Sequence, residues 1–138
     1  MSLIKFEIVT PEKVVLKETI KSITVPTKEG IITILPRHIP LIGILVPGVA
    51  EIKKENGEIE VFAVSSGFIE VQRDKVIMLA DTAELAKEID IERAKKRAEE
   101  VKKEIENKDD VDFAGVQAYI EKELARVKAA NRWRDIKK

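Results

Sequence analysis

The residues that break regular backbone structure are concentrated in the first half of this chain. All five prolines lie before residue 48, and five of the six glycines lie before residue 68. Charged residues show the opposite bias, with 22 in residues 1–86 and 28 in residues 87–138. Proline and glycine punctuate sheets and disfavour long helices. We therefore expect a β-rich domain over residues 1–86 and a helical domain over residues 87–138.

Residues 1–86 have the pattern of short strands. Apolar and polar residues largely alternate in residues 4–9 (IKFEIV) and 20–25 (IKSITV), which is the period of a half-buried strand. Asn56-Gly57 predicts a hairpin with a type I′ turn, because both residues tolerate positive φ, and residues 72–75 (QRDK) predict a second hairpin. Roughly eight to ten strands in this length predict a β-sandwich or flattened barrel.

Residues 87–138 have the helical period instead. The first apolar stripe consists of Ile91, Ala94, Ala98, Val101 and Ile105, and the second of Phe113, Val116, Ile120, Leu124 and Val127. The polar segment between the stripes offers three candidate N-caps, Asp109, Asp110 and Asp112. Two amphipathic helices with a short polar connection predict an antiparallel hairpin, so the expected fold class is α+β in two domains.

The predicted hairpin has little apolar surface to hold it together. Its first stripe uses Ala94 and Ala98, which allow close approach but bury little area. Isolated helices of this length are marginal in water. We therefore expect the hairpin to depend on packing against the sheet, a partner or a ligand, which makes it a candidate switch.

The start of the first predicted helix is also a candidate anion site. Asp90 can cap this helix, and counting back from a turn near residues 108 and 109 places Arg93 beside Arg126, with Arg97 one turn along and Arg132 near the same end. Converging guanidiniums repel one another unless an anion joins them, and phosphate matches the arginine fork. The alternative is a solvated face whose arginines pair with the nearby glutamates Glu88, Glu92 and Glu123.

Four segments of the chain resemble the epsilon subunit of bacterial F-type ATP synthases. They are VTPEKVV (residues 9–15), GIITILPRHIPLIGILVPG (30–48), SSGFIEV (65–71) and IDIERA (89–94). The last segment has that family's Ile/Leu-Asp-x-x-Arg-Ala motif, and the resemblance covers the whole chain. It implies a β-sandwich followed by a helical hairpin.

The resemblance implies a rotor part rather than an enzyme. Subunits of this family bind the gamma subunit of the central stalk and the ring of c subunits through the β-domain. Their hairpin folds against that domain or extends into the alpha/beta catalytic head and inhibits ATP hydrolysis. The expected function is therefore to couple proton transport to ATP synthesis, at the cytoplasmic face of the cell membrane, with membrane contact only through the complex.

In some members of the family, ATP bound at the motif favours the folded form. The resemblance thus implies no required cofactor, and ATP or MgATP as a regulatory ligand. Carried over by position, the ligand residues are Glu84, Ile89, Asp90, Arg93 and Ala94. For the late-helix arginine, hairpin geometry favours Arg126, whereas the match of KAANR (128–132) favours Arg132. Glu100 stands where members credited with ATP binding carry another arginine.

The chain shows no candidate catalytic or metal centre. His38 is the single histidine, and no carboxylate or second histidine flanks it. By resemblance its loop lies at the base of the β-domain, where we expect His38, and with it Glu29, to contact the c ring.

The charge balance does not favour nucleic acid or an acidic membrane surface. Lys+Arg and Asp+Glu number 25 each, and there is no cysteine, which excludes disulfides and thiolate chemistry. The longest apolar stretch, residues 39–50, is too short to span a bilayer and is interrupted by proline. An alternative is a small barrel that binds nucleic acid through the basic tail from Lys122 onward, although the chain has few aromatic residues for stacking on bases.

Overall fold

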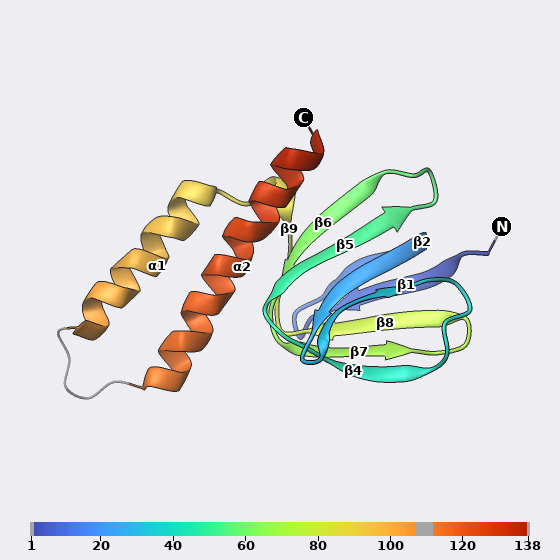
Figure 1. The fold of residues 1–138 in the computed structure, drawn as a ribbon, viewed down its shortest axis with the longest axis horizontal. Helices are drawn as coiled ribbons and strands as arrows, with labels where there is room; N and C mark the ends of the chain where they lie inside the picture. The colour runs from blue at the N-terminus through green and yellow to red at the C-terminus, as the bar shows by residue number, and fades with distance from the viewer. Residues whose placement is uncertain (1, 107–111, 138) are drawn as a thin grey trace.

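The computed structural model describes residues 2–106 and 112–137, and in them nine strands are followed by a helical hairpin (Figure 1). The strands are β1 (Ile4–Val9), β2 (Val14–Thr27), β3 (Gly30–Ile34), β4 (Leu41–Leu45), β5 (Gly48–Lys54), β6 (Ile59–Val64), β7 (Gly67–Val71), β8 (Lys75–Ala80) and β9 (Ala83–Leu85). The helices are the 3₁₀ helix η1 (Ala86–Glu88), α1 (Ile91–Glu106) and α2 (Phe113–Lys137). The predicted fold class is confirmed.

The strands form one hydrogen-bonded path that folds into a sandwich. Its order is β1-β8-β7-β4-β2-β5-β6-β9, and β1 also pairs with β2, which closes part of the path into a flattened barrel. β1 and β8 are parallel, whereas the other pairs are antiparallel. β3 pairs with β2 off the main path.

The sandwich core follows from the alternation seen in the sequence. In β1, Ile4, Phe6 and Ile8 are at most 4% exposed, while the residues between them point outward. Large side chains from both layers complete the cluster. Because each fully buried side chain of this size contributes about 1.5–3 kcal/mol, the sandwich has a substantial core of its own.

Both predicted hairpins occur, but one has a different turn. Gln72 N donates to Lys75 O at 2.8 Å between β7 and β8, as expected. Between β5 and β6, Gly57 has φ 88° and donates to Lys54 O at 2.9 Å, while Arg37 is the one described non-glycine residue with positive φ. The predicted type I′ turn is therefore wrong. A type I turn followed by a left-handed glycine forms a three-residue loop, and the Asn56 side chain supports it by accepting from Glu58 N at 2.9 Å.

The starts of both helices are capped by aspartates that the sequence predicted. Asp90 Oδ1 accepts from Arg93 N at 3.2 Å at the start of α1, and Asp112 Oδ1 accepts from Gly115 N at 3.1 Å at the start of α2. The other two candidate caps, Asp109 and Asp110, and the turn expected near residues 108 and 109 lie outside the described residues.

The two predicted apolar stripes have different outcomes. All five residues of the α1 stripe are buried or half-buried, and Ala94 and Ala98 are the most buried. In α2, Phe113 is 70% and Leu124 is 45% exposed, so these two positions were predicted wrongly. The reason is that α2 packs on the sandwich through a second face, which contains Ala129, Trp133 and Ile136.

The second helix lies between the first helix and the sandwich (Figure 1). α2 contacts β5, β6 and η1, and α1 packs on α2. The hairpin is therefore folded against the sandwich in this structure. Within the described part of the chain, neither helix combines the length and the apolar character needed to cross a membrane.

Candidate functional site

The residues of the Ile-Asp-x-x-Arg-Ala motif lie where α1 begins. Ile89 packs against a small apolar cluster between α2 and the sandwich, Asp90 caps α1, and Ala94 is fully buried. Arg93 is exposed, and its guanidinium has no hydrogen bond or ion pair within residues 2–106 and 112–137. Ile89 and Ala94 therefore support packing, whereas Arg93 stays available to a ligand.

Arg126 joins the hairpin to the last strand of the sandwich. Its Nε and Nη2 donate to the two carboxylate oxygens of Glu84 in β9 at 2.8 and 3.0 Å. Its Nη1 donates to Glu123 Oε2, one turn earlier in α2, at 2.9 Å. The hydrogen bonds that Arg126 donates to Glu84, with a further contribution from the one to Glu123, raise the pKa of Arg126 above its usual value, although burial opposes the shift.

The Glu123 carboxylate has little access to water. Its side chain is 3% exposed and that of Arg126 is 17% exposed, whereas Glu84 is more open at 38%. A carboxylate buried to this extent is costly unless a hydrogen-bonded cation accompanies it. Arg126 supplies that cation through Nη1, and its Nε and Nη2 donate to Glu84.

Arg132 makes a second contact with the sandwich. Its Nε donates to Glu51 Oε1 in β5, and its Nη2 lies 3.4 Å from Glu51 Oε2. This hydrogen bonding to Glu51 raises the pKa of Arg132. The pair is more open than that of Arg126, since the two side chains are 49% and 25% exposed.

The structure therefore divides the predicted ligand residues. It brings Glu84 and Arg126 together, and it directs Arg132 to Glu51 instead of the start of α1. Of the two alternatives for these arginines, the pairing with glutamates occurs for Arg126, which contacts the expected Glu123 and also Glu84, while Arg132 pairs with Glu51. Binding of ATP by the predicted residues stays a prediction.

A face of α2 that the sequence analysis missed makes the apolar contact with the sandwich. Ala129 is fully buried in a cluster with Val61, Ala63 and Ala86, and Trp133 and Ile136 pack against it. On α2, the residues Ala125, Ala129, Trp133 and Ile136 follow one another at +4, +4 and +3. A second helical stripe was therefore present in the sequence. Its small alanines made it less conspicuous than the stripe of larger side chains.

A shallow cavity of about 480 Å³ lies between the segment from η1 to the start of α1 and the C-terminal end of α2. Its lining residues are apolar or basic: Ala86, Lys87, Ile89, Ile91, Ala130, Trp133, Arg134 and Lys137. The Lys137 ammonium lies 4.7 Å from the centre of the Trp133 ring, within the range of a cation–π contact. Of the predicted ligand residues, Ile89 alone lines this cavity.

The two residues expected to contact a partner lie at opposite ends of β3. Glu29 is exposed in the turn before this strand, and His38 is half-buried in the loop after it, with Nδ1 2.7 Å from Ile39 O. Exposed apolar side chains follow the same edge, at Ile31, Leu35 and Ile39. Among the described residues, no group of three or more histidine, aspartate or glutamate side chains could hold a metal ion.

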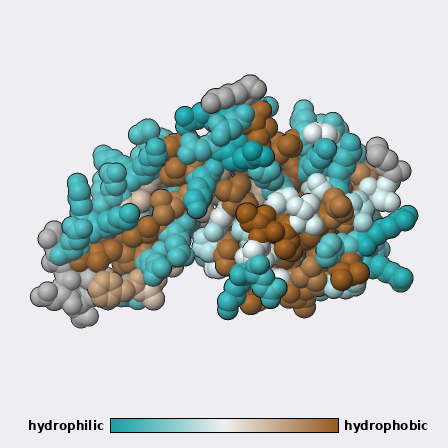
Figure 2. All heavy atoms as spheres, viewed as in Figure 1, coloured by the Kyte–Doolittle hydropathy of each residue, from teal (hydrophilic) through white to brown (hydrophobic). Residues whose placement is uncertain are grey.

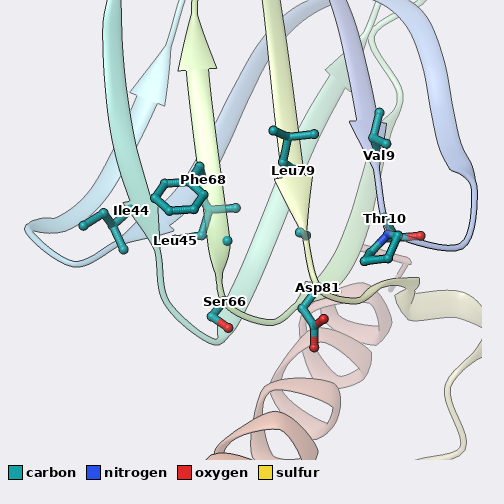
Figure 3. Close-up of a pocket in the computed structure, with 11 residues that line it drawn as sticks. Val9, Thr10, Ile44, Leu45, Ser66, Phe68, Leu79 and Asp81 are labelled. Atoms are coloured by element: carbon teal, nitrogen blue, oxygen red, sulfur yellow. The ribbon is translucent and has the colours of Figure 1, made fainter.

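The outer face of the sandwich carries an exposed apolar row. Ile44 of β4 pairs with Phe68 of β7, which pairs with Leu79 of β8, and the three side chains are 46–53% exposed. They border an open cavity of about 660 Å³ that is mostly lined by apolar residues (Figure 3). Figure 2 shows further hydrophobic surface on the sandwich, whereas the hairpin has hydrophilic side chains along its outer margin and a hydrophobic stripe along its length. Exposed apolar patches of this kind commonly bind another protein.

Sequence comparisons agree over nearly the whole chain. Residues 3–86 match the family described as the ATP synthase Delta/Epsilon chain, beta-sandwich domain. The ATP synthase epsilon chain of Chloroflexus aggregans is 48% identical over 128 residues, which cover 92% of this chain and 91% of that one. The epsilon chain of Propionigenium modestum, described as sodium ion specific, is 38% identical over 134 residues, covering 96% and 97%.

A comparison of structures gives the same fold. A chain in the cryo-EM structure of the Euglena gracilis mitochondrial ATP synthase, containing OSCP, F1 and the c-ring in rotational state 1, superposes with a TM-score of 0.72 at 22% identity. The match covers 100% of this chain and 83% of the other. The fold, the motif at the start of α1 and the relatives agree: this chain belongs to the family of ATP synthase epsilon chains.

Proposed function

We propose that this chain is a non-catalytic rotor subunit of an F-type ATP synthase. It couples proton transport to ATP synthesis, and its hairpin restrains ATP hydrolysis by the catalytic head. The observation that carries the proposal is the unequal way in which the two parts are held. The sandwich has a large apolar core of its own, whereas α2 rests on it through a smaller apolar cluster around Ala129, joined by Trp133 and Ile136, and through ion pairs. An element held this lightly can move without unfolding its neighbour.

The apolar row of Ile44, Phe68 and Leu79 is the proposed contact with the gamma subunit. It lies on strands fixed by the core, so its shape is already formed before binding. The exposed edge of β3, between Glu29 and His38, is the proposed contact with the c ring. The proposed location is the cytoplasmic face of the cell membrane, where the chain is a peripheral part of the complex and reaches the membrane only through its partners.

The hairpin provides the proposed regulation. With 25 residues, α2 is about 37 Å long, so it reaches well beyond the sandwich when it is released and extended toward the alpha/beta head. ATP or MgATP is the proposed ligand of the folded form, since Arg93 is exposed and unpaired within the described residues. A ligand at a hundred times its dissociation constant stabilises the form it binds by about 2.7 kcal/mol, which is enough to bias a weakly held hairpin.

Reconstitution with the catalytic head and the gamma subunit tests this proposal. The full chain should bind a gamma-containing head and lower its ATP hydrolysis. Phe68→Asp should weaken that binding at least tenfold, because it places a charge in the apolar contact. Phe113→Asp is the matched control: it makes the same change at an exposed position of the hairpin and should leave gamma binding unchanged. Equal binding of both variants would reject the proposed gamma surface, and a head unaffected by the full chain would reject the proposed function.

A further inference from the structure

The contact between α2 and the sandwich has a charged part that does not depend on any bound molecule. Arg126 reaches Glu84, and Arg132 reaches Glu51. We refer to these two ion pairs as the carboxylate clamp. The partners are 42 and 81 residues apart in the sequence, so each pair joins the hairpin to the sandwich.

The two ends of the clamp lie on either side of Ala129, and the apolar contact continues beyond Arg132 to Trp133 and Ile136. Arg126 and Arg132 are six residues apart in α2, a rise of roughly 9 Å along the helix, and fully buried Ala129 lies midway between them. Since alanine buries little area, the apolar contact at this point is thin. The ion pairs therefore add to the hold of α2 on the sandwich at this point, beside the packing of Trp133 and Ile136 farther along the helix.

Glu123 orients the guanidinium of Arg126 at one end of the clamp. Its pair with Arg126 is within α2 and stays with the helix when the helix leaves the sandwich, whereas the pair of Arg126 with Glu84 must break. The buried Glu123 carboxylate accepts from Nη1 of Arg126 and so leaves Nε and Nη2 directed toward Glu84. Glu123 is thus a positioning residue for the clamp.

We propose that Glu84 and Glu51 are built-in counter-ions that hold the hairpin on the sandwich without a nucleotide. In the folded form they occupy the guanidiniums of Arg126 and Arg132, so an anionic ligand that takes either arginine has to displace a carboxylate. Such a ligand loosens the hairpin at that point, and a ligand that favours the folded form must be bound through other cations. This inference rests on the proposed switching function and concerns its control.

A distance measurement on the isolated full chain tests the clamp. The chain has no cysteine, so Glu58→Cys on the sandwich and Asn131→Cys on α2 provide two label sites at exposed positions. We expect the labels to report a folded hairpin in the absence of nucleotide and at low salt. Raising the salt should increase the released fraction, because partly exposed ion pairs are screened. A hairpin that is released until ATP is added would overturn the proposal.

Charge reversal separates the clamp from a general loss of stability. Glu51→Arg and Arg132→Glu should each lower the folded-to-released ratio by about three- to tenfold, given the exposure of this pair, and the double reversal should restore it to within about twofold. Glu84→Gln, measured without nucleotide, should lower the ratio about tenfold because a charged bidentate contact is lost. Lys96→Glu is the matched control, since it makes the same reversal on an exposed α1 residue with no partner in the described chain.

The outcomes also distinguish the clamp from the proposed function. Unchanged ratios in the single reversals, or no recovery in the double reversal, would overturn the clamp while leaving gamma binding and inhibition intact. Binding of each variant to the gamma-containing head shows that the sandwich is folded. Failure of the unlabelled, unsubstituted chain to bind the gamma-containing head would instead count against the proposed function.

Discussion

The sandwich and the hairpin of this protein are built on opposite principles. In the sandwich, large side chains such as Phe6, Phe62 and Ile52 are at most 1% exposed, and strands far apart in the sequence share one core. In α1, the buried positions are alanines, Ala94 and Ala98. The comparison shows that the sandwich buries large side chains whereas α1 buries small ones, and the proposed movement of the hairpin depends on this difference.

The charges of the two regions differ in the same way. In the sandwich, Glu7 pairs with Lys17 and Lys75 on neighbouring strands, so these contacts add to a sheet that is already paired. In the hairpin, Arg126 and Arg132 pair with residues of another element that the backbone does not fix to α2. The ion pairs of Glu7 therefore join strands of one sheet, while those of Arg126 and Arg132 join the hairpin to the sandwich, as the proposed clamp requires.

The largest effect is expected from a cavity in the sandwich core. Phe6→Ala should lower the free energy of unfolding of the sandwich by about 3–5 kcal/mol, because a buried phenyl ring is lost and its space is filled incompletely. Chemical denaturation followed by a probe in the sheet measures this change. An exposed phenylalanine, Phe113→Ala, is the control; similar losses for both would contradict the contrast between core and arm.

A smaller effect, confined to the hairpin, is expected from replacing Arg126. Arg126→Ala leaves the buried Glu123 carboxylate without its cation, which should cost about 3 kcal/mol. The loss should appear as release of α2, with little change in unfolding of the sandwich. Hydrogen exchange of the strands and of α2 in the same sample distinguishes the two. A variant in which the strands and α2 lose protection equally would show that the hairpin is an integral part of the domain.

The smallest effect is a pH dependence confined to the sandwich. The hydrogen bond between Glu7 and Lys75 holds the pKa of Glu7 below its ordinary value of 4.5. The folded state therefore favours the charged form, so this contribution to stability is present above that value and is lost as the pH falls through the lower folded pKa. In Glu7→Gln, the decline in stability between about pH 5 and pH 3 should be shallower than in the unchanged chain. An identical decline would show that the Glu7 pairs are irrelevant to acid stability.

Local patterns in the sequence were sufficient to predict most of the fold. The alternation in β1, the two hairpin positions and the caps Asp90 and Asp112 all depend on neighbouring residues, and the structure confirms them. The turn at Asn56-Gly57 was harder, because the same dipeptide serves two turn types and the choice depends on the loop length.

The candidate site could be predicted only in part, because its partners are distant in the sequence. The motif placed Asp90 and Arg93 at the start of α1, and both lie there. Counting along two helices could not show that Glu51 of β5 would meet Arg132, since that contact depends on how α2 lies on the sheet. The second face of α2 was missed for a similar reason: two of its members are alanines, which a search for large apolar residues passes over.

Native-state hydrogen exchange on the isolated chain without nucleotide tests the central claim most directly. The account predicts that amides of α1 and α2 exchange through an opening several kcal/mol less costly than the opening that exposes β1, β2 and β7, because the hairpin is released while the sandwich stays folded. Equal protection of the helices and the core strands would contradict it, since the hairpin would then open only when the whole protein unfolds.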